Sequence, residues 1–170
     1  MIILGLDPGF ARVGYGIIKK QKGDLKVLTF GSISTPGKQD FCGRLLQISL
    51  DLEKLIKKYK PNHCAIEELF FFKNLKTAVA VASARGVLLV GAKKLKLDVF
   101  EYTPLQVKQA ITGYGRADKT QIMRMVTNIL KIKTKIKLDD VTDALAVAIC
   151  HASSLNFLNR LSQKQLNPKN

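Results

Sequence analysis

The sequence predicts an α/β fold in which a five-stranded mixed sheet is flanked by helices. Three short apolar runs near the N-terminus follow one another through brief turns, and strands joined in this way pair antiparallel. Further along, apolar runs alternate with helical segments, a pattern that gives parallel strands with crossover helices. The 170 residues are enough for one domain, which we expect to span residues 1–155 and to be followed by a polar, basic tail, residues 156–170.

The N-terminal part begins with three predicted strands, at residues 2–7, 13–19 and 25–34. The first ends in Asp7-Pro8-Gly9, which is typical of a turn. Apolar residues then recur at spacings of three and four, the stripe of an amphipathic helix that Pro61 closes. This stripe consists of Phe41, Leu45, Ile48, Leu52, Leu55, Ile56 and Tyr59.

The remaining chain alternates strands and helices. A short apolar run at residues 64–66 leads into two glutamates, and a fifth strand is expected at 99–102. Between them lies a helix, 77–94, whose alanines and glycines allow another helix to approach closely. Further helices are expected at 104–112, 118–131 and 139–154.

The charge balance indicates a polyanionic partner. The chain has 28 Lys and Arg against 13 Asp and Glu, a formal charge of +15, which exceeds what solubility alone favours. Nucleic acid is the natural partner of such a surface, and a merely solvated basic surface is the alternative.

Cysteine usage and hydropathy indicate an intracellular protein. Cys42, Cys64 and Cys150 are odd in number, widely spaced and set among apolar neighbours, as expected of reduced core thiols rather than disulfides or a zinc site. No segment approaches the roughly 18 apolar residues of a membrane span, and the N-terminal run has no basic leader. We therefore expect a cytoplasmic location and no membrane partner.

Four acidic residues stand out because each lies at the end of an apolar element in a basic chain: Asp7, Glu67, Asp140 and Asp143. The first two end strands that we expect to be adjacent, and the last two lie three residues apart on one face of a helix. Each alone is typical of a turn residue or a helix cap. Together they predict a cluster of carboxylates.

Such a cluster needs protons or metal ions, because two like charges about 4 Å apart repel by about 4 kcal/mol at an effective dielectric constant of 20. Oxygen ligands favour Mg²⁺ or Mn²⁺, and four carboxylates balance two divalent ions. Two such ions can activate a water and stabilise the leaving oxygen in phosphodiester hydrolysis. An acidic pocket on a basic surface therefore suggests a nuclease.

With these residues assembled, the sequence resembles the RuvC-type Holliday junction resolvases, crossover junction endodeoxyribonucleases of the ribonuclease H-like fold. The resemblance covers about residues 1–152. It rests on the stretches GLDPGFARVGYGI, AIEELFFFKN, SARGV, VFEYTPLQVKQAITGYGRADKTQI and DDVTDALAVAICH. It implies that the four acids bind two magnesium ions per subunit, which manganese can replace.

The resemblance also selects between neighbouring acids. The family's acid directly follows the Ala-Ile pair, which selects Glu67, and strand alternation turns Glu68 the other way. Asp140 has the right spacing to Asp143, which leaves Asp139 as a helix cap or an outer partner of the site.

Further residues receive roles from the resemblance. Lys108 and Lys119 are placed beside the acids, Lys119 to stabilise the phosphate in the transition state; by themselves they are ordinary solvated lysines. Phe70 matches an aromatic residue that resolvases use against unpaired bases, and stacking on a splayed base independently supports this role. Five basic residues are expected phosphate contacts from charge and position alone. They are Arg12, Lys73, Lys76, Arg85 and Arg116.

The function implied is a magnesium-dependent homodimeric endonuclease of recombination and repair. It would resolve four-way DNA junctions by paired, symmetric nicks that leave 5′-phosphate and 3′-hydroxyl ends, working with the RuvA and RuvB branch-migration proteins. The helix at 77–94 would form a two-fold dimer that matches the two equivalent strands of a junction.

Two alternatives remain: a non-catalytic junction-binding protein of the same fold, and a ribonuclease acting on RNA–DNA hybrids. An ATP-binding protein of the actin and sugar-kinase class is not expected, because it needs a second lobe for which 170 residues leave no room.

Overall fold

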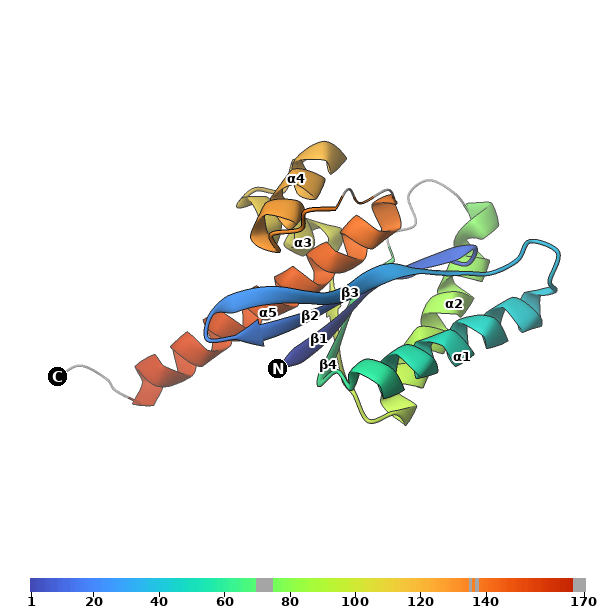
Figure 1. Ribbon diagram of the computed structural model, residues 1–170, viewed down its shortest axis with the longest axis horizontal. Helices are drawn as coiled ribbons and strands as arrows, with labels where there is room; N and C mark the ends of the chain where they lie inside the picture. The colour runs from blue at the N-terminus through green and yellow to red at the C-terminus, as the bar shows by residue number, and fades with distance from the viewer. Residues whose placement is uncertain (70–74, 135, 137, 167–170) are drawn as a thin grey trace.

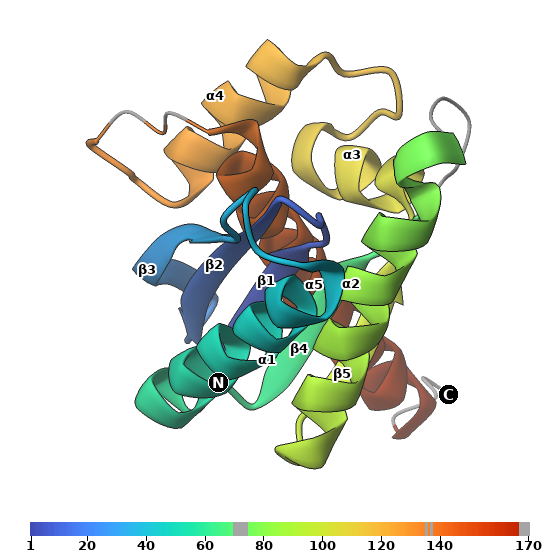
Figure 2. The same ribbon diagram turned by 90° about the vertical axis from the view of Figure 1, so that its right-hand side faces the viewer.

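The computed structural model describes residues 1–69, 75–134, 136 and 138–166, except for the side chains of residues 75, 76 and 156–166. Its centre is a sheet with strand order β3-β2-β1-β4-β5 (Figures 1 and 2; β5 is labelled in Figure 2). The strands are β1 (Ile2–Asp7), β2 (Arg12–Gln21), β3 (Asp24–Ser34), β4 (His63–Glu67) and β5 (Asp98–Tyr102). β1 pairs antiparallel with β2 but parallel with β4, so the predicted mixed sheet is confirmed.

Helices cover both faces of the sheet. The helices are α1 (Phe41–Tyr59), α2 (Leu75–Lys94), α3 (Pro104–Thr112), α4 (Lys119–Ile129) and α5 (Asp139–Leu166). Figures 1 and 2 show α1 and α2 on one face and α3, α4 and α5 on the other. Strand alternation divides the core accordingly: Leu4 and Leu6 pack towards α1 and α2, and Ile3 packs towards α5.

Local signals explain where α1 begins and ends. The Asp40 carboxylate accepts a hydrogen bond from the Gly43 amide at 2.9 Å, which caps the first turn. At the other end Lys60 adopts a left-handed conformation and its amide donates to the Ile56 carbonyl, and Pro61 then prevents continuation.

The C-terminal helix is longer than predicted. We expected it to end at residue 154 and a polar tail to follow, but α5 continues through Leu166. Residues 155–166 contain neither Gly nor Pro, so nothing in the sequence stops the helix before Pro168. The polar composition was therefore a poor guide to the helix end.

The cysteine prediction holds for two residues and is wrong for the third. All three thiols are free, and Cys64 and Cys150 are buried, but Cys42 is exposed. Cys42 lies on the first turn of α1, outside the stripe that Leu45 and Ile48 continue into the core. Within the residues described here, none of the helices has the length and apolar character to cross a membrane.

Candidate active site

Asp7 and Glu67 lie side by side at the ends of two parallel strands. Leu6 of β1 pairs with Ile66 of β4, and each acid is the next residue of its strand. Because side chains alternate along a strand, Asp7 shares the face of Gly5, against which α5 packs. The predicted meeting of these two acids is therefore confirmed by the register.

Three glycines bring α5 unusually close to the sheet. A Cβ atom at Gly5 would lie 2.8 Å from the Ala148 Cβ, and side chains at Gly14 and Gly16 would collide with Asp140 and Leu145. Sequence reasoning missed these residues. The signal was present, since a glycine within a strand marks the close approach of another backbone.

The first turns of α5 supply the remaining acids. Gly14, which pairs with Asp7 across β1 and β2, contacts the backbone of Asp140, so the start of the helix lies over the end of β1. Asp143 follows one turn later on the same face. Three elements far apart in sequence thus contribute one group of carboxylates.

The pKa values of the acids show their burial and mutual repulsion. The pKa of Asp7 is raised to about 8, first by burial and then by the negative charges of its neighbours; these are Asp143, Glu67 and Asp140. Burial and Asp143 raise the pKa of Glu67 to about 7. The pKa of Asp143 is also raised, mainly by burial. The site therefore holds its negative charge at a cost.

Two lysines offset the repulsion between the acids, and each lies on a helix whose first turn is capped. Thr103 and Gln106 form a capping box that begins α3, the helix of Lys108. A second capping box begins α4 with Lys119 as its first residue. The charges of both lysines lower the pKa of Glu67, so both lie near the acids, as the resemblance implied.

Two further ion pairs line the site. The Lys119 Nζ atom lies 3.0 Å from the Asp139 carboxylate, and hydrogen bonding to Asp139 is the largest cause that raises the pKa of Lys119. Arg12 Nη1 lies 3.4 Å from Asp140 Oδ2. Asp139 is therefore a partner of a lysine beside the acids, and Arg12, expected to contact phosphate, pairs with one of the acids.

The other predicted DNA contacts are placed as follows. Arg116 is exposed between α3 and α4. Arg85 is half-buried, pairs with Glu101 and donates to the Glu67 carbonyl oxygen at 3.4 Å. Glu68 lines a surface hollow with Arg85 and Glu101 and is not among the charges that shift the pKa of Glu67, in keeping with its expected opposite orientation. Phe70 and Lys73, and the side chain of Lys76, lie outside the described residues.

The donor set suits hard divalent cations. It offers only carboxylate oxygens, which such ions prefer, and a bound cation would replace the protons that the raised pKa values of Asp7 and Glu67 indicate. Among the described side chains, no three His, Cys, Asp or Glu residues form a ready-made cage. The carboxylates therefore have to reorient before three of them can bind one ion.

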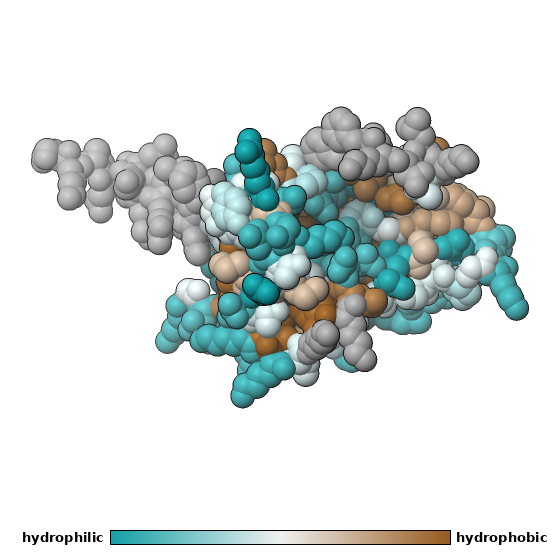
Figure 3. Space-filling model, turned by 90° about the horizontal axis from the view of Figure 1, so that it is seen from above, coloured by the Kyte–Doolittle hydropathy of each residue, from teal (hydrophilic) through white to brown (hydrophobic). Residues whose placement is uncertain are grey.

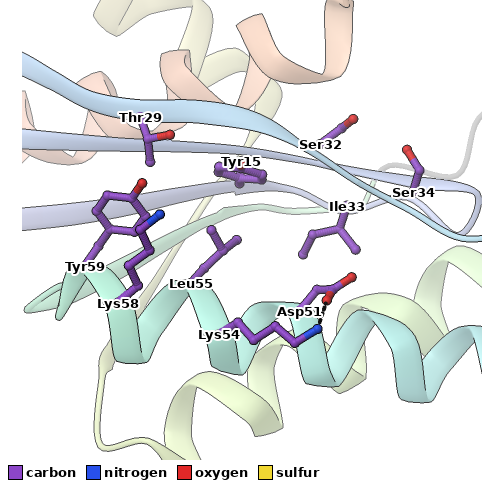
Figure 4. A pocket seen from close by; sticks show the side chains of 10 residues that line it. All are labelled: Tyr15, Thr29, Ser32, Ile33, Ser34, Asp51, Lys54, Leu55, Lys58 and Tyr59. Atoms are coloured by element: carbon purple, nitrogen blue, oxygen red, sulfur yellow. Dashed lines mark hydrogen bonds and ion pairs between the residues drawn. The ribbon is translucent and has the colours of Figure 1, made fainter.

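A separate hollow on the described surface does not contain this chemistry. The groove between β3 and α1 has a volume of about 410 Å³, and Figure 4 shows that Lys54, Lys58 and Tyr59 line it from the helix. None of the four acids contributes to it.

The side seen from above, on which α3 and α4 lie, carries mostly hydrophilic side chains with smaller apolar areas between them (Figure 3).

Comparisons with known proteins identify relatives over most of the chain. A family model described as crossover junction endodeoxyribonuclease RuvC matches residues 3–151. The crossover junction endodeoxyribonuclease RuvC of Halothermothrix orenii is 51% identical over 160 residues, which cover 94% of this chain and 96% of that protein. The RuvC of Ruminiclostridium cellulolyticum is 53% identical over 154 residues, 91% of this chain and 93% of that protein. The structure of T. thermophilus RuvC in complex with Holliday junction substrate superposes with a TM-score of 0.86 at 31% identity and covers 92% of this chain and 96% of that one.

Proposed function

The chain belongs to the RuvC family of crossover junction endodeoxyribonucleases and is a Holliday junction-resolving endonuclease, and we propose that it acts as a metal-dependent homodimer. The observation that carries the catalytic proposal is the convergence of acids from β1, β4 and α5 on one face of the sheet. A binding module of the same fold has no need for carboxylates that repel one another.

Asp7, Glu67, Asp140 and Asp143 would hold two Mg²⁺ ions, which Mn²⁺ can replace. Ions held by these carboxylates would supply the activation of a water and the neutralisation of charge on the leaving oxygen of the phosphodiester. The chain itself contributes the alignment: β1 and β4 fix two carboxylates in register, and the glycine contacts of α5 fix the other two above them. Hydrolysis leaves a 5′-phosphate and a 3′-hydroxyl.

Positive side chains beside the acids complete the site. Lys119 and Lys108 already lower the pKa of Glu67, so they are close enough to stabilise charge on a bound phosphate. Arg12 now pairs with Asp140. An arriving cation would compete for that carboxylate and release the guanidinium to contact the DNA backbone.

The dimer proposal rests on α2 and the neighbouring face of α1. Val79 and Val90 are 73% and 56% exposed, a cost in water unless another surface covers them. An apolar groove of about 460 Å³ runs between the two helices, and Gly86 and Gly91 lie along it. A second copy packed there in two-fold symmetry would present two active sites to the two equivalent strands of a junction.

Junction DNA as substrate, RuvA and RuvB as partners and the cytoplasm as location complete the proposal. So do base contacts by Phe70 and phosphate contacts by Lys73, Lys76, Arg85 and Arg116. Mapping both strands of a synthetic junction after incubation with magnesium tests it: paired nicks at symmetric positions, sealed afterwards by DNA ligase, support the proposal. Single unpaired nicks, or ends that ligase rejects, contradict it.

A further inference from the structure

The loop between β1 and β2, residues 8–11, is held against the first turn of α1 by Arg44. The loop follows Asp7 directly and leads into Arg12, so it joins two charged residues of the active site. Nothing in the catalytic proposal above uses Arg44, whose own charge is absent from the causes that shift the pKa of Asp7.

Arg44 makes three different contacts with one guanidinium group. Its Nη2 donates to the Phe10 carbonyl oxygen at 3.3 Å, and its Nε donates to Thr35 Oγ1 at 2.8 Å. Its Cζ lies 3.9 Å from the centroid of the Phe10 ring. A planar fork can stack and donate in two directions at once, which a lysine ammonium cannot do.

Thr35 makes two further hydrogen bonds to the same loop. Its side chain is nearly inaccessible, at 8% exposure, and its hydroxyl donates to the Phe10 carbonyl oxygen at 2.9 Å. Its amide donates to the Ala11 carbonyl at 3.1 Å. The Phe10 ring also stacks on Phe41, with centroids 5.0 Å apart. The loop is thereby fixed to the end of β3 and to the first turns of α1.

A loop this short transmits displacement to both of its ends. A side chain at Gly9 would collide with the Arg12 carbonyl, so the turn is already as tight as a glycine allows. A shift of the Phe10 carbonyl would therefore pull on Asp7, three residues before it, and on Arg12, two residues after it. Misplacing a reacting group by about 1 Å can slow an enzyme about 100-fold.

We propose that Arg44 is a positioning residue of the endonuclease, which holds the Phe10–Ala11 backbone so that Asp7 and Arg12 stay aligned with α5. This inference rests on the proposed function. The fold itself depends little on Arg44, because α1 is anchored in the core by Ile48, Leu52 and Ile56. Loss of Arg44 should therefore change the geometry of the site more than the stability of the chain.

The test compares single-turnover cleavage of a synthetic four-way junction by the unaltered dimer and by Arg44→Ala, Arg44→Lys and Thr35→Val. Lys54→Ala is the matched control, since it removes one positive charge from the same helix at a side chain that is 74% exposed. Junction affinity and melting temperature are measured for each variant. Millimolar guanidinium chloride is then added to the alanine variant and, in parallel, to Asp7→Asn.

We expect Arg44→Ala to cleave about ten- to a hundred-fold more slowly at saturating protein, with an affinity like that of Lys54→Ala. Arg44→Lys should stay slow although it keeps the charge, and Thr35→Val should lose part of the rate. Guanidinium should restore cleavage to Arg44→Ala but not to Asp7→Asn. Backbone amide NMR shifts in the metal-free protein should move in residues 9–12 and leave β5 unchanged.

Equal cleavage by Arg44→Ala and Lys54→Ala would overturn the role. So would a rate that falls only as the folded fraction falls, with no rescue by guanidinium. If Arg44→Ala does not fold, a full cleavage rate in Thr35→Val and Arg44→Lys overturns it instead. Failure of the unaltered protein to cut is a separate result, which refutes the proposed function and this role with it.

Discussion

Gly14 touches the backbone of Asp140 so closely that a Cβ atom at position 14 would overlap the Asp140 carbonyl oxygen. Gly14 pairs with Asp7 across the β1–β2 ladder, so this contact sets how near the start of α5 lies to the first acid. The distance between the acids therefore depends on a residue that carries no functional group.

Gly14→Ala should displace the first turn of α5 and slow cleavage by about ten-fold or more while junction binding persists, since misplaced catalytic groups cost rate. Single-turnover kinetics and a junction titration measure the two effects. Gly37→Ala is the matched control, because a Cβ atom there meets nothing within 4 Å. Wild-type cleavage by a folded Gly14→Ala protein would show that the contact does not set the site.

The raised pKa of Asp7 makes the metal-free protein less stable as pH rises. Between the ordinary value of 3.8 and about 8, the folded state keeps a proton that the unfolded state has released. The free energy of unfolding must then fall with rising pH across this window. Asp7→Asn should remove the penalty and stabilise the chelator-treated protein near pH 8 by about 2 to 5 kcal/mol, with little change near pH 4.

Asp51→Asn is the control, because its effect on the pH dependence of the free energy of unfolding should have the opposite sign. Burial raises the pKa of Asp51, but hydrogen bonds from Lys54 and Gln47 outweigh it and lower the pKa. Its stabilisation is present above the ordinary pKa and is lost as pH falls. Denaturant titrations near pH 4 and near pH 8 measure both variants. If Asp7→Asn gains no free energy of unfolding near pH 8, the acids do not form a buried, mutually repelling cluster.

Substitutions of Lys119 and Asp139 should have very different effects on the cleavage rate. If Lys119 stabilises a bound phosphate as proposed, Lys119→Ala should slow the chemical step by about 100-fold. Asp139 lies 3.0 Å from the Lys119 Nζ atom, and if it only positions that lysine and binds no ion, Asp139→Ala should retain most of the rate. Single-turnover rates at saturating magnesium decide this, and equal losses for Asp139→Ala and Asp140→Ala would refute the assignment.

The exposed valines of α2 test the dimer. Val79→Glu combined with Val90→Glu should shift the mass by light scattering to that of one 18.8 kDa chain and uncouple the two incisions, because charges would be buried at the interface. Leu28→Glu, on β3, makes the same chemical change at a distant exposed position and should leave the mass unaltered. A dimer that survives both valine changes must use another surface.

Much of the fold followed from local pattern. Apolar runs and spacings of three and four located every strand and helix, and the brief turns gave the antiparallel pairs. The acids were recognisable because a charged residue at the end of a buried strand indicates either a turn or a functional site. Chain order alone then placed two of them on adjacent strands.

What the sequence did not reveal depends on contacts between distant elements. The pairing of Arg12 with Asp140 joins residues 128 positions apart. The hydrogen bond from Arg44 to the Phe10 carbonyl depends on where the first turn of α1 lies relative to the sheet. The glycines of β1 and β2 received no role from the sequence, because their function depends on the close packing of α5 against them. The extent of α5 was missed because polar residues continue a helix as well as they end one.

The most direct test of metal-dependent junction cleavage through Asp7 is an assay with magnesium on a four-way junction, a matched linear duplex and an RNA–DNA hybrid, using the unaltered protein and Asp7→Asn. We expect paired, ligatable nicks in the junction alone, which disappear in Asp7→Asn while junction binding remains. Cleavage of the hybrid, or undiminished junction cleavage by Asp7→Asn, would contradict it.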